Sequence, residues 1–231
     1  MSMHLGILVF ARSGSSRLPD KALRLIGGIP LLERVIRRAQ LLPYPTFLAT
    51  TDHPADDRLV ALARRLGVAS FRGSEDRVLE RAVLAAEAFG LDAFARLCGD
   101  RPLFPLDDLQ EAAEMMQRVS VSEPQAGPDL VTTYADGRCP RGLMTEIVRT
   151  GTLRRVLNHG VSSEQQEHLT LYFYEHREDF RIVNLPSPDS SFVCPGFAVD
   201  SQSDLGNLDR ICSANPALDL TPAEADRIHT S

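Results

Sequence analysis

A short segment near the N-terminus combines three cations with small residues, a composition suited to binding phosphate groups. Residues 11–21 read ARSGSSRLPDK, and Arg12, Arg17 and Lys21 supply the positive charges. Small side chains let backbone N–H groups approach phosphate oxygens, and the cations neutralise the roughly three to four negative charges of a nucleoside triphosphate. The spacing matches neither the P-loop nor the dinucleotide-binding fingerprint. We therefore expect a triphosphate-binding loop of another type; a surface turn with three unrelated basic residues is the structural alternative.

A carboxylate, Asp100, follows a second apolar segment in the stretch RLCGDRPLFP at residues 96–105. In an open α/β sheet, ligands bind beyond the carboxyl ends of the strands. Since the cationic loop and Asp100 both follow predicted strands, we expect them to meet in one crevice. The alternative role for Asp100 is to cap the helix that comes after it.

The elements that must position these residues alternate between strand and helix. The apolar run Leu5–Phe10 predicts a buried parallel strand, and the spacing of Leu32, Val35, Ile36 and Ala39 predicts an amphipathic helix. This alternation is typical of a three-layer, doubly wound, mostly parallel sheet of the Rossmann-like α/β class. The strands are expected at 5–10, 46–51, 68–72 and 93–98, and the helices at 31–42, 57–66, 78–89 and 106–120.

The second half of the chain has shorter elements, which predicts an excursion from this sheet before a last strand near Val199 returns to it. No internal repeat or clean linker interrupts the sequence. We therefore expect one domain over residues 1–231 with a small arm at roughly 136–186. Strands are expected at 130–134, 145–148, 181–185 and 197–199, and helices at 151–158 and 166–174.

Composition excludes several classes of partner. The 231 residues are 43% apolar and 24% charged, enough for one α/β domain with a full core. A net charge of −6 without any run of Lys or Arg argues against nucleic acid, and no apolar run approaches the ~20 residues of a membrane span. The cysteines lack zinc-ligand spacing and predict reduced thiols in a cytoplasmic protein. They are Cys98, Cys139, Cys194 and Cys212.

The loop pattern A-R-x-G-S-x-R-L-P-x-K and the segment GIPLLER at 28–34 resemble motifs of the sugar cytidylyltransferases. The resemblance is closest to the spore-coat polysaccharide cytidylyltransferases, which are related to the acylneuraminate and 3-deoxy-manno-octulosonate cytidylyltransferases. Five motifs occur in the right order over residues 5–212. Asp20 stands where the family usually has Gly, and Cys98 where Thr is common. If position 20 needs a positive φ, Asp is among the better substitutes.

The resemblance implies that Mg²⁺ is held by Asp100 and by Asp200, which lies in the segment FAVDSQSDL at 197–205. Two carboxylates with phosphate oxygens and water suit this hard, octahedral cation. Asp204, later in the same segment, is expected to begin a helix rather than to bind metal. No Ser/His/Asp set in a recognisable context is present, which disfavours covalent catalysis.

The activity implied is transfer of a cytidylyl group from CTP to a hydroxyl of a sugar or sugar acid, giving a CMP-sugar and pyrophosphate, for surface polysaccharide or glycan biosynthesis. Arg12, Lys21 and Asp100 would act in catalysis, with CTP as co-substrate. The polar stretch at 49–57 would help to read the nucleoside, as would Ser74 and Asp76, which could instead cap the next helix. The residues implied for the nucleotide are Ala11, Arg12, Gly14, Ser15, Ser16, Arg17, Lys21, Ser74, Asp76 and Arg77.

Two further segments, PRGLMTE at 140–146 and QEHLTLY at 166–172, resemble motifs on the acceptor side of the family's crevice. They imply that Arg141, Glu146 and His168 lie there, near a dimer contact, and Arg138 could also meet an acceptor carboxylate. A single His before a helical stretch is more often structural than catalytic. The resemblance and the spare apolar residues of the arm predict a homodimer.

Two alternatives stay open at this point. Base preference depends on a few strand-end contacts, so a nucleotidyltransferase that uses GTP, UTP or ATP would show the same layout. A catalytically inactive nucleotide-binding scaffold is the other alternative, and it is disfavoured because every charged residue with an assigned role is present. The identity of the acceptor is not defined by the sequence.

Overall fold

The first strand, β1, lies inside the sheet with a parallel neighbour on each side, β4 and β6. Its continuous apolar sequence LGILVF suits a strand that is covered on both faces. The computed structural model describes residues 3–15, 17–122, 127–134, 137, 139–186, 191–194 and 196–230. The strands of the main sheet are β1 (Leu5–Phe10), β4 (Thr46–Thr51), β5 (Ala69–Gly73), β6 (Ala93–Cys98), β7 (Leu130–Thr132), β8 (Glu146–Arg149) and β9 (Ile182–Asn184).

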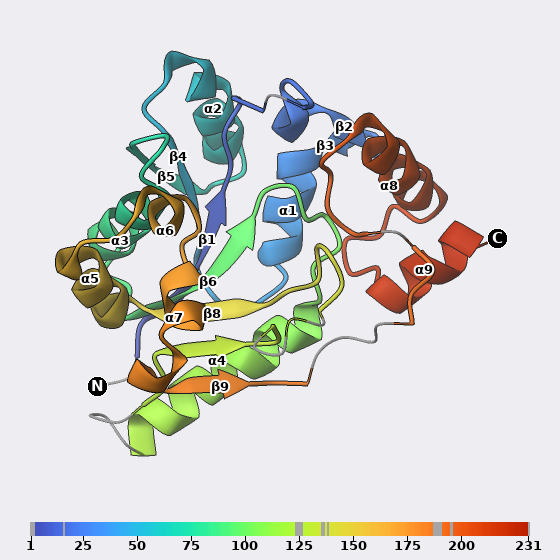
Figure 1. Cartoon of the computed structure of the whole chain (residues 1–231). Coiled ribbons are helices and arrows are strands. Elements are labelled where there is room, and N and C mark those ends of the chain that lie inside the picture. Colours follow the sequence, from blue (N-terminus) through green and yellow to red (C-terminus); the bar gives the residue numbers. More distant parts are fainter. Residues whose placement is uncertain are drawn as a thin grey trace.

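These seven strands form one sheet in the order β5-β4-β1-β6-β8-β7-β9 (Figure 1). Strand β8 is antiparallel to both of its neighbours, with Phe94 opposite Val148 in the register with β6, and all the other pairs are parallel. The predicted mostly parallel sheet is therefore confirmed. The carboxyl ends of β1, β4 and β6 meet along one edge.

Helices cover both faces of the sheet and bury two separate apolar clusters, so the predicted three-layer arrangement is also confirmed. One cluster includes apolar residues of α1 (Leu31–Ala39), α2 (Asp57–Arg65), α4 (Leu106–Ser122), α8 (Gln202–Ala214) and α9 (Pro222–Thr230). On the other face lie α3 (Val78–Ala88), α5 (Thr150–His159), α6 (Ser163–Glu167) and α7 (Leu171–Glu175).

Helix α1 buries the four apolar residues predicted for its inner face, but it ends at Ala39, three residues earlier than expected. It also buries two arginines, Arg34 and Arg38, which hydrophobic periodicity did not indicate. Arg38 Nε donates to the Phe104 carbonyl oxygen at 2.9 Å, and Arg34 Nη1 donates to that of Pro216 at 3.3 Å. Burial lowers the pKa of Arg38 to about 10. The bond to Pro216 fastens the C-terminal segment to the core.

Two predicted elements are wrong. Residues 197–199 form no strand; instead the Val199 N–H donates to the Asp100 carbonyl oxygen at 2.9 Å, which brings the following residue, Asp200, beside the end of β6. The expected helix over 166–174 is broken around His168 into α6 and α7. Helix α9 was not predicted, nor was the hairpin of β2 (Leu25–Ile26) and β3 (Ile29–Pro30), which lies against α8.

The segment predicted as an arm contributes β8 and β9 to the main sheet and places α5, α6 and α7 over one face of it. Its proposed first residue, Asp136, lies outside the described residues. The division of the chain into one domain and a dimerisation arm stays a prediction.

Candidate active site

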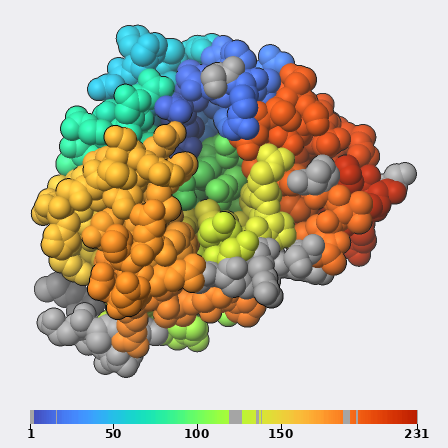
Figure 2. Space-filling model, in the orientation of Figure 1, coloured from blue at the N-terminus to red at the C-terminus, as the bar shows by residue number. Residues whose placement is uncertain are grey.

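A cavity of about 840 Å³ opens beyond the carboxyl ends of β1 and β6. Figure 2 shows the hollow between the N-terminal residues in blue and the gold to orange segment near α6 and α7, with the green middle of the chain at its floor. The cationic loop and Asp100 both line it, as predicted. The loop residues that do so are Ala11, Arg12, Gly14, Ser15, Arg17 and Lys21. Ser16 lies outside the described residues.

The loop is anchored at Ser13 by a buried carboxylate, Asp56, which is 1% exposed. Asp56 accepts hydrogen bonds from the Ser13 N–H at 2.7 Å, from Thr50 Oγ1 at 2.9 Å and from Thr51 Oγ1 at 2.5 Å. Burial alone would raise the pKa of Asp56, but these donors hold it below the usual value. The stretch at 49–57, expected to help read the nucleoside, contributes no residue to the cavity lining, and its Asp56 holds the loop.

Asp20 adopts a left-handed conformation, with φ 56° and ψ 25°, just before the short 3₁₀ helix η1 (Lys21–Leu23). Among the described residues it is the only one other than glycine with a positive φ. The positive φ considered for this position is therefore confirmed, and Asp adopts it. Its Oδ1 also pairs with Arg58. The turn directs Lys21 back toward the sheet.

Lys21 joins the two carboxylates predicted to bind metal. Its Nζ lies 2.6 Å from Asp100 Oδ2 and 3.4 Å from Asp200 Oδ1, and it also donates to the Val199 carbonyl oxygen at 3.1 Å. A Cβ on Gly99, beside Asp100, would lie 2.9 Å from the Ala11 Cβ, so glycine lets the chain pack closely against the end of β1 at this point. Asp200 is not among the residues that line the cavity, but Lys21 connects it directly to one that is.

Three cations surround Asp200. Arg17 Nη2 lies 3.3 Å and Arg141 Nη1 3.0 Å from its carboxylate oxygens, in addition to Lys21. Burial alone would raise the pKa of Asp200, but the charge of Lys21 and the bonds from Arg141 hold it below its usual value. Asp200 is therefore ionised at neutral pH.

The donor set suits Mg²⁺ but does not complete a site for it. In the described part of the chain, no three His, Cys, Asp or Glu side chains come together as metal ligands. The two carboxylates already face a common positive charge, the Lys21 ammonium, so a cation is accommodated electrostatically between them. Mg²⁺ commonly takes one or two protein carboxylates and completes its coordination with water and substrate phosphates. Asp100 and Asp200 fit that role.

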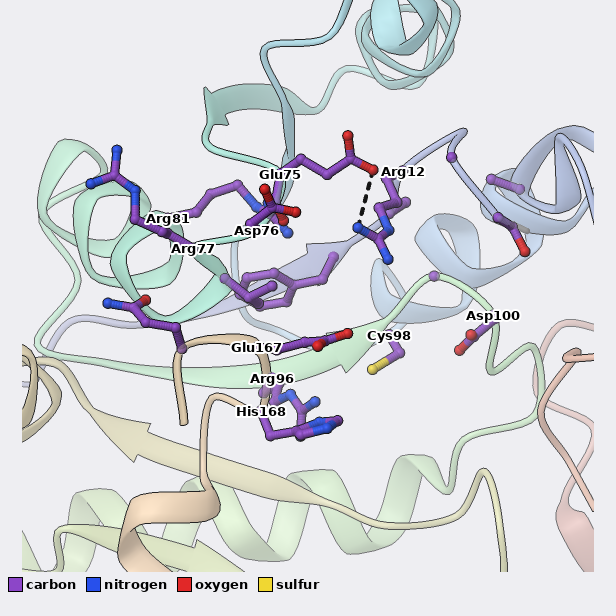
Figure 3. A pocket seen from close by; sticks show the side chains of 18 of the residues that line it. Arg12, Glu75, Asp76, Arg77, Arg81, Arg96, Cys98, Asp100, Glu167 and His168 are labelled. Carbon is purple, nitrogen blue, oxygen red and sulfur yellow. Dashed lines mark hydrogen bonds and ion pairs between the residues drawn. The ribbon is translucent and has the colours of Figure 1, made fainter. Parts of the chain in front are cut away.

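On the other side of the loop, Asp76 and Arg77 line the cavity together with Glu75, which the sequence did not single out. Glu75 Oε1 lies 3.1 Å from Arg12 Nη1 (Figure 3), and a Cβ on Gly14 would lie 2.8 Å from the same oxygen. Ser74 does not line the cavity, and its Oγ accepts the Arg77 N–H at 3.3 Å. It is not the N-cap of α3 either, since that residue is Arg77.

Arg81, on α3, holds the backbone of the segment that contains Glu75. Only 3% of it is exposed, and its Nη1 donates to the carbonyl oxygens of Ser74 and, at 3.2 Å, Glu75. Within the described residues its Nε has no partner. A buried arginine at this place could not be recognised from hydrophobic periodicity, although it ends the motif that contains Ser74 and Asp76.

The three residues expected on the acceptor side are in different environments. His168 lines the cavity, together with Gln166 and Glu167. Arg141 lies outside the lining and pairs with Asp200 and, at 2.6 Å, with Asp204. Arg138 lies outside the described residues.

Glu146 is also absent from the cavity lining and is only 1% exposed. Its Oε2 lies 2.7 Å from Nη1 of Arg96, and its Oε1 accepts the Tyr174 hydroxyl at 2.8 Å. Arg96 itself lines the cavity. Sequence reasoning missed Arg96, although the pairing of Ala95 with Ile147 in neighbouring strands places it next to Glu146. Opposite charges at facing strand positions were the available signal.

Two smaller predictions are confirmed. Asp204 lies in the first turn of α8 and forms a capping box, in which the Ser201 hydroxyl accepts the Asp204 N–H at 3.2 Å and the Asp204 carboxylate accepts the Ser201 N–H at 2.9 Å. The four cysteines are free thiols, and Cys98 lines the cavity next to Asp100.

Comparison with known proteins supports the resemblance. A family model described as cytidylyltransferase matches residues 6–195. The spore coat polysaccharide biosynthesis protein SpsF of Bacillus subtilis (strain 168) is 31% identical over 210 residues, which cover 87% of this chain and 83% of that protein. In the described part of the chain, none of the helices combines the length and the apolar character needed to cross a bilayer.

Solved structures share the fold. A cytidylyltransferase from Leptospira borgpetersenii serovar Hardjo-bovis (strain JB197) superposes with a TM-score of 0.88 at 23% identity, over 99% of this chain and 94% of that one. A CMP:2-keto-3-deoxy-manno-octonic acid synthetase complexed with CTP gives a TM-score of 0.65 at 20% identity, over 91% of this chain and 98% of that one.

Proposed function

Because this chain belongs to the cytidylyltransferase family, we propose that it transfers the cytidylyl group of CTP to a hydroxyl of a sugar or sugar acid and releases pyrophosphate. One observation carries the assignment of the site. The cationic loop after β1 and the carboxylate after β6 line the same cavity, and Lys21 Nζ lies 2.6 Å from Asp100 Oδ2. Cations for a triphosphate and one of the two carboxylates for a metal therefore face one space.

In the proposed reaction, the acceptor hydroxyl oxygen bonds to the α-phosphorus of CTP, and the bond from that phosphorus to the bridging oxygen of the β-phosphate breaks. The hydroxyl proton passes to solvent, and pyrophosphate leaves. Arg12, Arg17 and Lys21 hold the triphosphate and stabilise the charge that develops on the leaving group. The protein contributes positioning and charge neutralisation rather than a covalent intermediate.

Asp100 and Asp200 are the residues that would hold Mg²⁺. When bound, the ion would neutralise phosphate oxygens and lower the pKa of the attacking hydroxyl. In the structure the Lys21 ammonium contacts both carboxylates. Lys21 is also the only lysine in the chain, since every other basic residue among the 25 is arginine. Its flexible stem suits a group that can move between the carboxylates and a phosphate.

The name of the Bacillus subtilis relative assigns that protein to spore coat polysaccharide biosynthesis. By extension, we propose that this chain supplies an activated sugar for a surface polysaccharide or glycan. Its location in the cytoplasm and its assembly as a homodimer belong to the same proposal. Light scattering after size-exclusion chromatography tests the dimer, and a monomer at micromolar concentration would contradict it.

The direct test is pyrophosphate release with Mg²⁺ and a panel of sugars and sugar acids, run with CTP, ATP, GTP and UTP in parallel. We expect release only with CTP and one acceptor class, and a fall of at least about a hundredfold in Asp100→Asn. The matched control is Asp57→Asn, which removes an exposed carboxylate outside the cavity and should retain activity. Equal turnover with another nucleotide, or an unaffected Asp100→Asn, would refute the proposal.

A further inference from the structure

Two arginines of the cavity are held in the same way. Arg12 uses Nη1 to pair with Glu75, and Arg96 uses Nη1 to pair with Glu146. Among the residues that the structure describes, neither arginine makes a hydrogen bond through Nε or Nη2. That edge of the guanidinium carries two parallel N–H donors, the arrangement that binds a carboxylate or phosphate with two bonds. Each arginine therefore offers an oriented, unused anion-binding edge.

The two arginines lie apart, and Figure 3 shows Arg12 on one side of the cavity and Arg96 near His168 on the other. Arg12 belongs to the loop that would hold the triphosphate. Arg96 and Cys98 of β6 both line the cavity, and Asp100 lines it two residues beyond Cys98. Residues two apart in an extended strand are separated by about 7 Å. An acceptor whose hydroxyl reacts near Asp100 would extend toward Arg96.

The Arg96 arrangement is the more rigid of the two. The side chains of Arg96 and Glu146 are 17% and 1% exposed, compared with 42% and 39% for Arg12 and Glu75. The second oxygen of Glu146 is occupied by the Tyr174 hydroxyl at 2.8 Å, and that hydroxyl also lies 3.0 Å from Thr132 Oγ1. Although burial alone would raise the pKa of Glu146, the Arg96 guanidinium holds it below its usual value. Glu146 is thus a positioning residue that fixes the orientation of Arg96.

We propose that the free Nε–Nη2 edge of Arg96 binds an oxyanion of the acceptor, so that the enzyme prefers acceptors with a carboxylate or a phosphate over matched neutral ones. This inference rests on the proposed function, since it assigns a group of the acceptor. A neutral acceptor that displaces water from this edge would leave two donors of a half-buried cation unpaired, which costs binding energy. The preference follows from that cost.

The test compares matched pairs of probes that differ only in charge, titrated into the CTP-loaded protein without divalent metal and followed by ligand-observed NMR. One pair is 3-deoxy-manno-octulosonate and its methyl ester, and the other is glucose 6-phosphate and glucose. We expect one anion to bind at least about tenfold more tightly than its neutral partner, as for one charge-assisted interaction. The pair that shows the difference identifies the anion as a carboxylate or a phosphate. Equal affinities in both pairs, or no binding of either anion, would overturn the inference.

Variants at Arg96 assign the preference to its side chain. Arg96→Gln should reduce the preference to less than about twofold while leaving the Kd of CTP unchanged. The matched control is Arg154→Gln, which removes an arginine paired with Glu87 outside the cavity and should keep the full preference. A preference that persists in Arg96→Gln would overturn the inference.

Arg96→Gln leaves Glu146 buried without its partner and can therefore unfold the protein. Two further variants avoid this problem: Arg96→Lys keeps the ion pair but lacks the two-donor edge, and Arg96→Gln with Glu146→Gln removes both charges. Both should lose the preference. Pyrophosphate release is measured separately on the same proteins. If the anion preference depends on Arg96 but no acceptor is turned over, the proposed function alone is refuted. If neutral acceptors are turned over and the substitutions at Arg96 leave turnover unchanged, this inference alone is refuted.

Discussion

Nζ of Lys21 lies 2.6 Å from Oδ2 of Asp100, so the only lysine of the chain neutralises a carboxylate that is 79 residues distant in sequence. The contact depends on the left-handed turn at Asp20, which directs the chain back toward the sheet. A second oxygen, Asp200 Oδ1, lies 3.4 Å from the same nitrogen. Lys21 is therefore the cation that contacts both carboxylates, while Arg17 and Arg141 pair with Asp200 as well.

We expect Lys21→Ala to lower kcat by about a hundredfold or more and to change the KM for CTP less, because the cation acts mainly on charge that develops in the transition state. Arg24→Ala, which removes an exposed cation three residues later, is the control and should leave both constants within about twofold. Steady-state kinetics over CTP concentration measures both. A raised KM with an unchanged kcat would show that Lys21 contributes only to binding.

Asp56→Ala should lower both stability and CTP affinity, because Asp56 accepts hydrogen bonds from Ser13 and from two threonines at a buried position. Leaving those donors unpaired costs about 2–4 kcal/mol of unfolding free energy, and the phosphate loop loses its anchor at Ser13. Urea denaturation and the KM for CTP measure the two effects. Asp57→Ala, at an exposed neighbour, should cost less than about 1 kcal/mol. Comparable losses in both variants would show that the buried bonds are not the cause.

The capping carboxylate Asp204 gives a pH dependence at the acid end. Burial alone would raise its pKa, but Arg141, the Asp200 N–H and Ser201 lower it from 3.8 to about 2. A depressed pKa stabilises the fold above the unfolded value, and the contribution is lost as pH falls through about 2. Asp204→Asn should therefore be about 1–2 kcal/mol less stable than the wild type at pH 7, and the difference should shrink below pH 4. A difference that does not vary between pH 7 and pH 3 would contradict the assignment.

The first half of the fold was predictable because the local sequence pattern and the packing of the sheet favour the same elements there. The main-sheet strands β1, β4, β5 and β6 are short, largely apolar runs that end at small or polar residues, and the structure places each within one residue of the expected bounds. Asp20 was likewise recognisable, since an aspartate at a glycine position indicates a positive φ. The cavity formed by the two strand ends follows from the topology of a parallel sheet.

Predictions from the sequence failed at two kinds of position: apolar residues that are buried outside any strand or helix, and charged residues that are buried. Phe197 and Val199 are buried like strand residues, yet they make isolated backbone hydrogen bonds to Arg141 and Asp100 instead of a ladder. Arg96 and Arg38 are held by partners 50 and 66 residues away, and no local pattern specifies such pairs. Glu146 was found by resemblance, but its contact with Arg96 required the register of two antiparallel strands.

Asp108, near the start of α4, gives the opposite pH dependence. Burial raises its pKa to about 6, with a contribution from the neighbouring charges of Glu111 and Asp107, and its Oδ2 has no hydrogen-bond partner among the described residues. A raised pKa stabilises the fold below the unfolded value of 3.8, and this contribution is lost as pH rises through about 6. The ionised carboxylate is thus a cost at pH 8 that an amide would not carry.

Asp108→Asn should accordingly be more stable than the wild type at pH 8, by about 1–2 kcal/mol after allowing for partial exposure, and the gain should disappear by pH 4. Urea denaturation at half-unit steps of pH locates the change, which we expect near pH 6. Asp107→Asn removes an exposed carboxylate from the same helical turn and should show no comparable step. If Asp108→Asn is no more stable than the wild type at pH 8, the carboxylate is solvated or paired in solution and burial does not govern its ionisation.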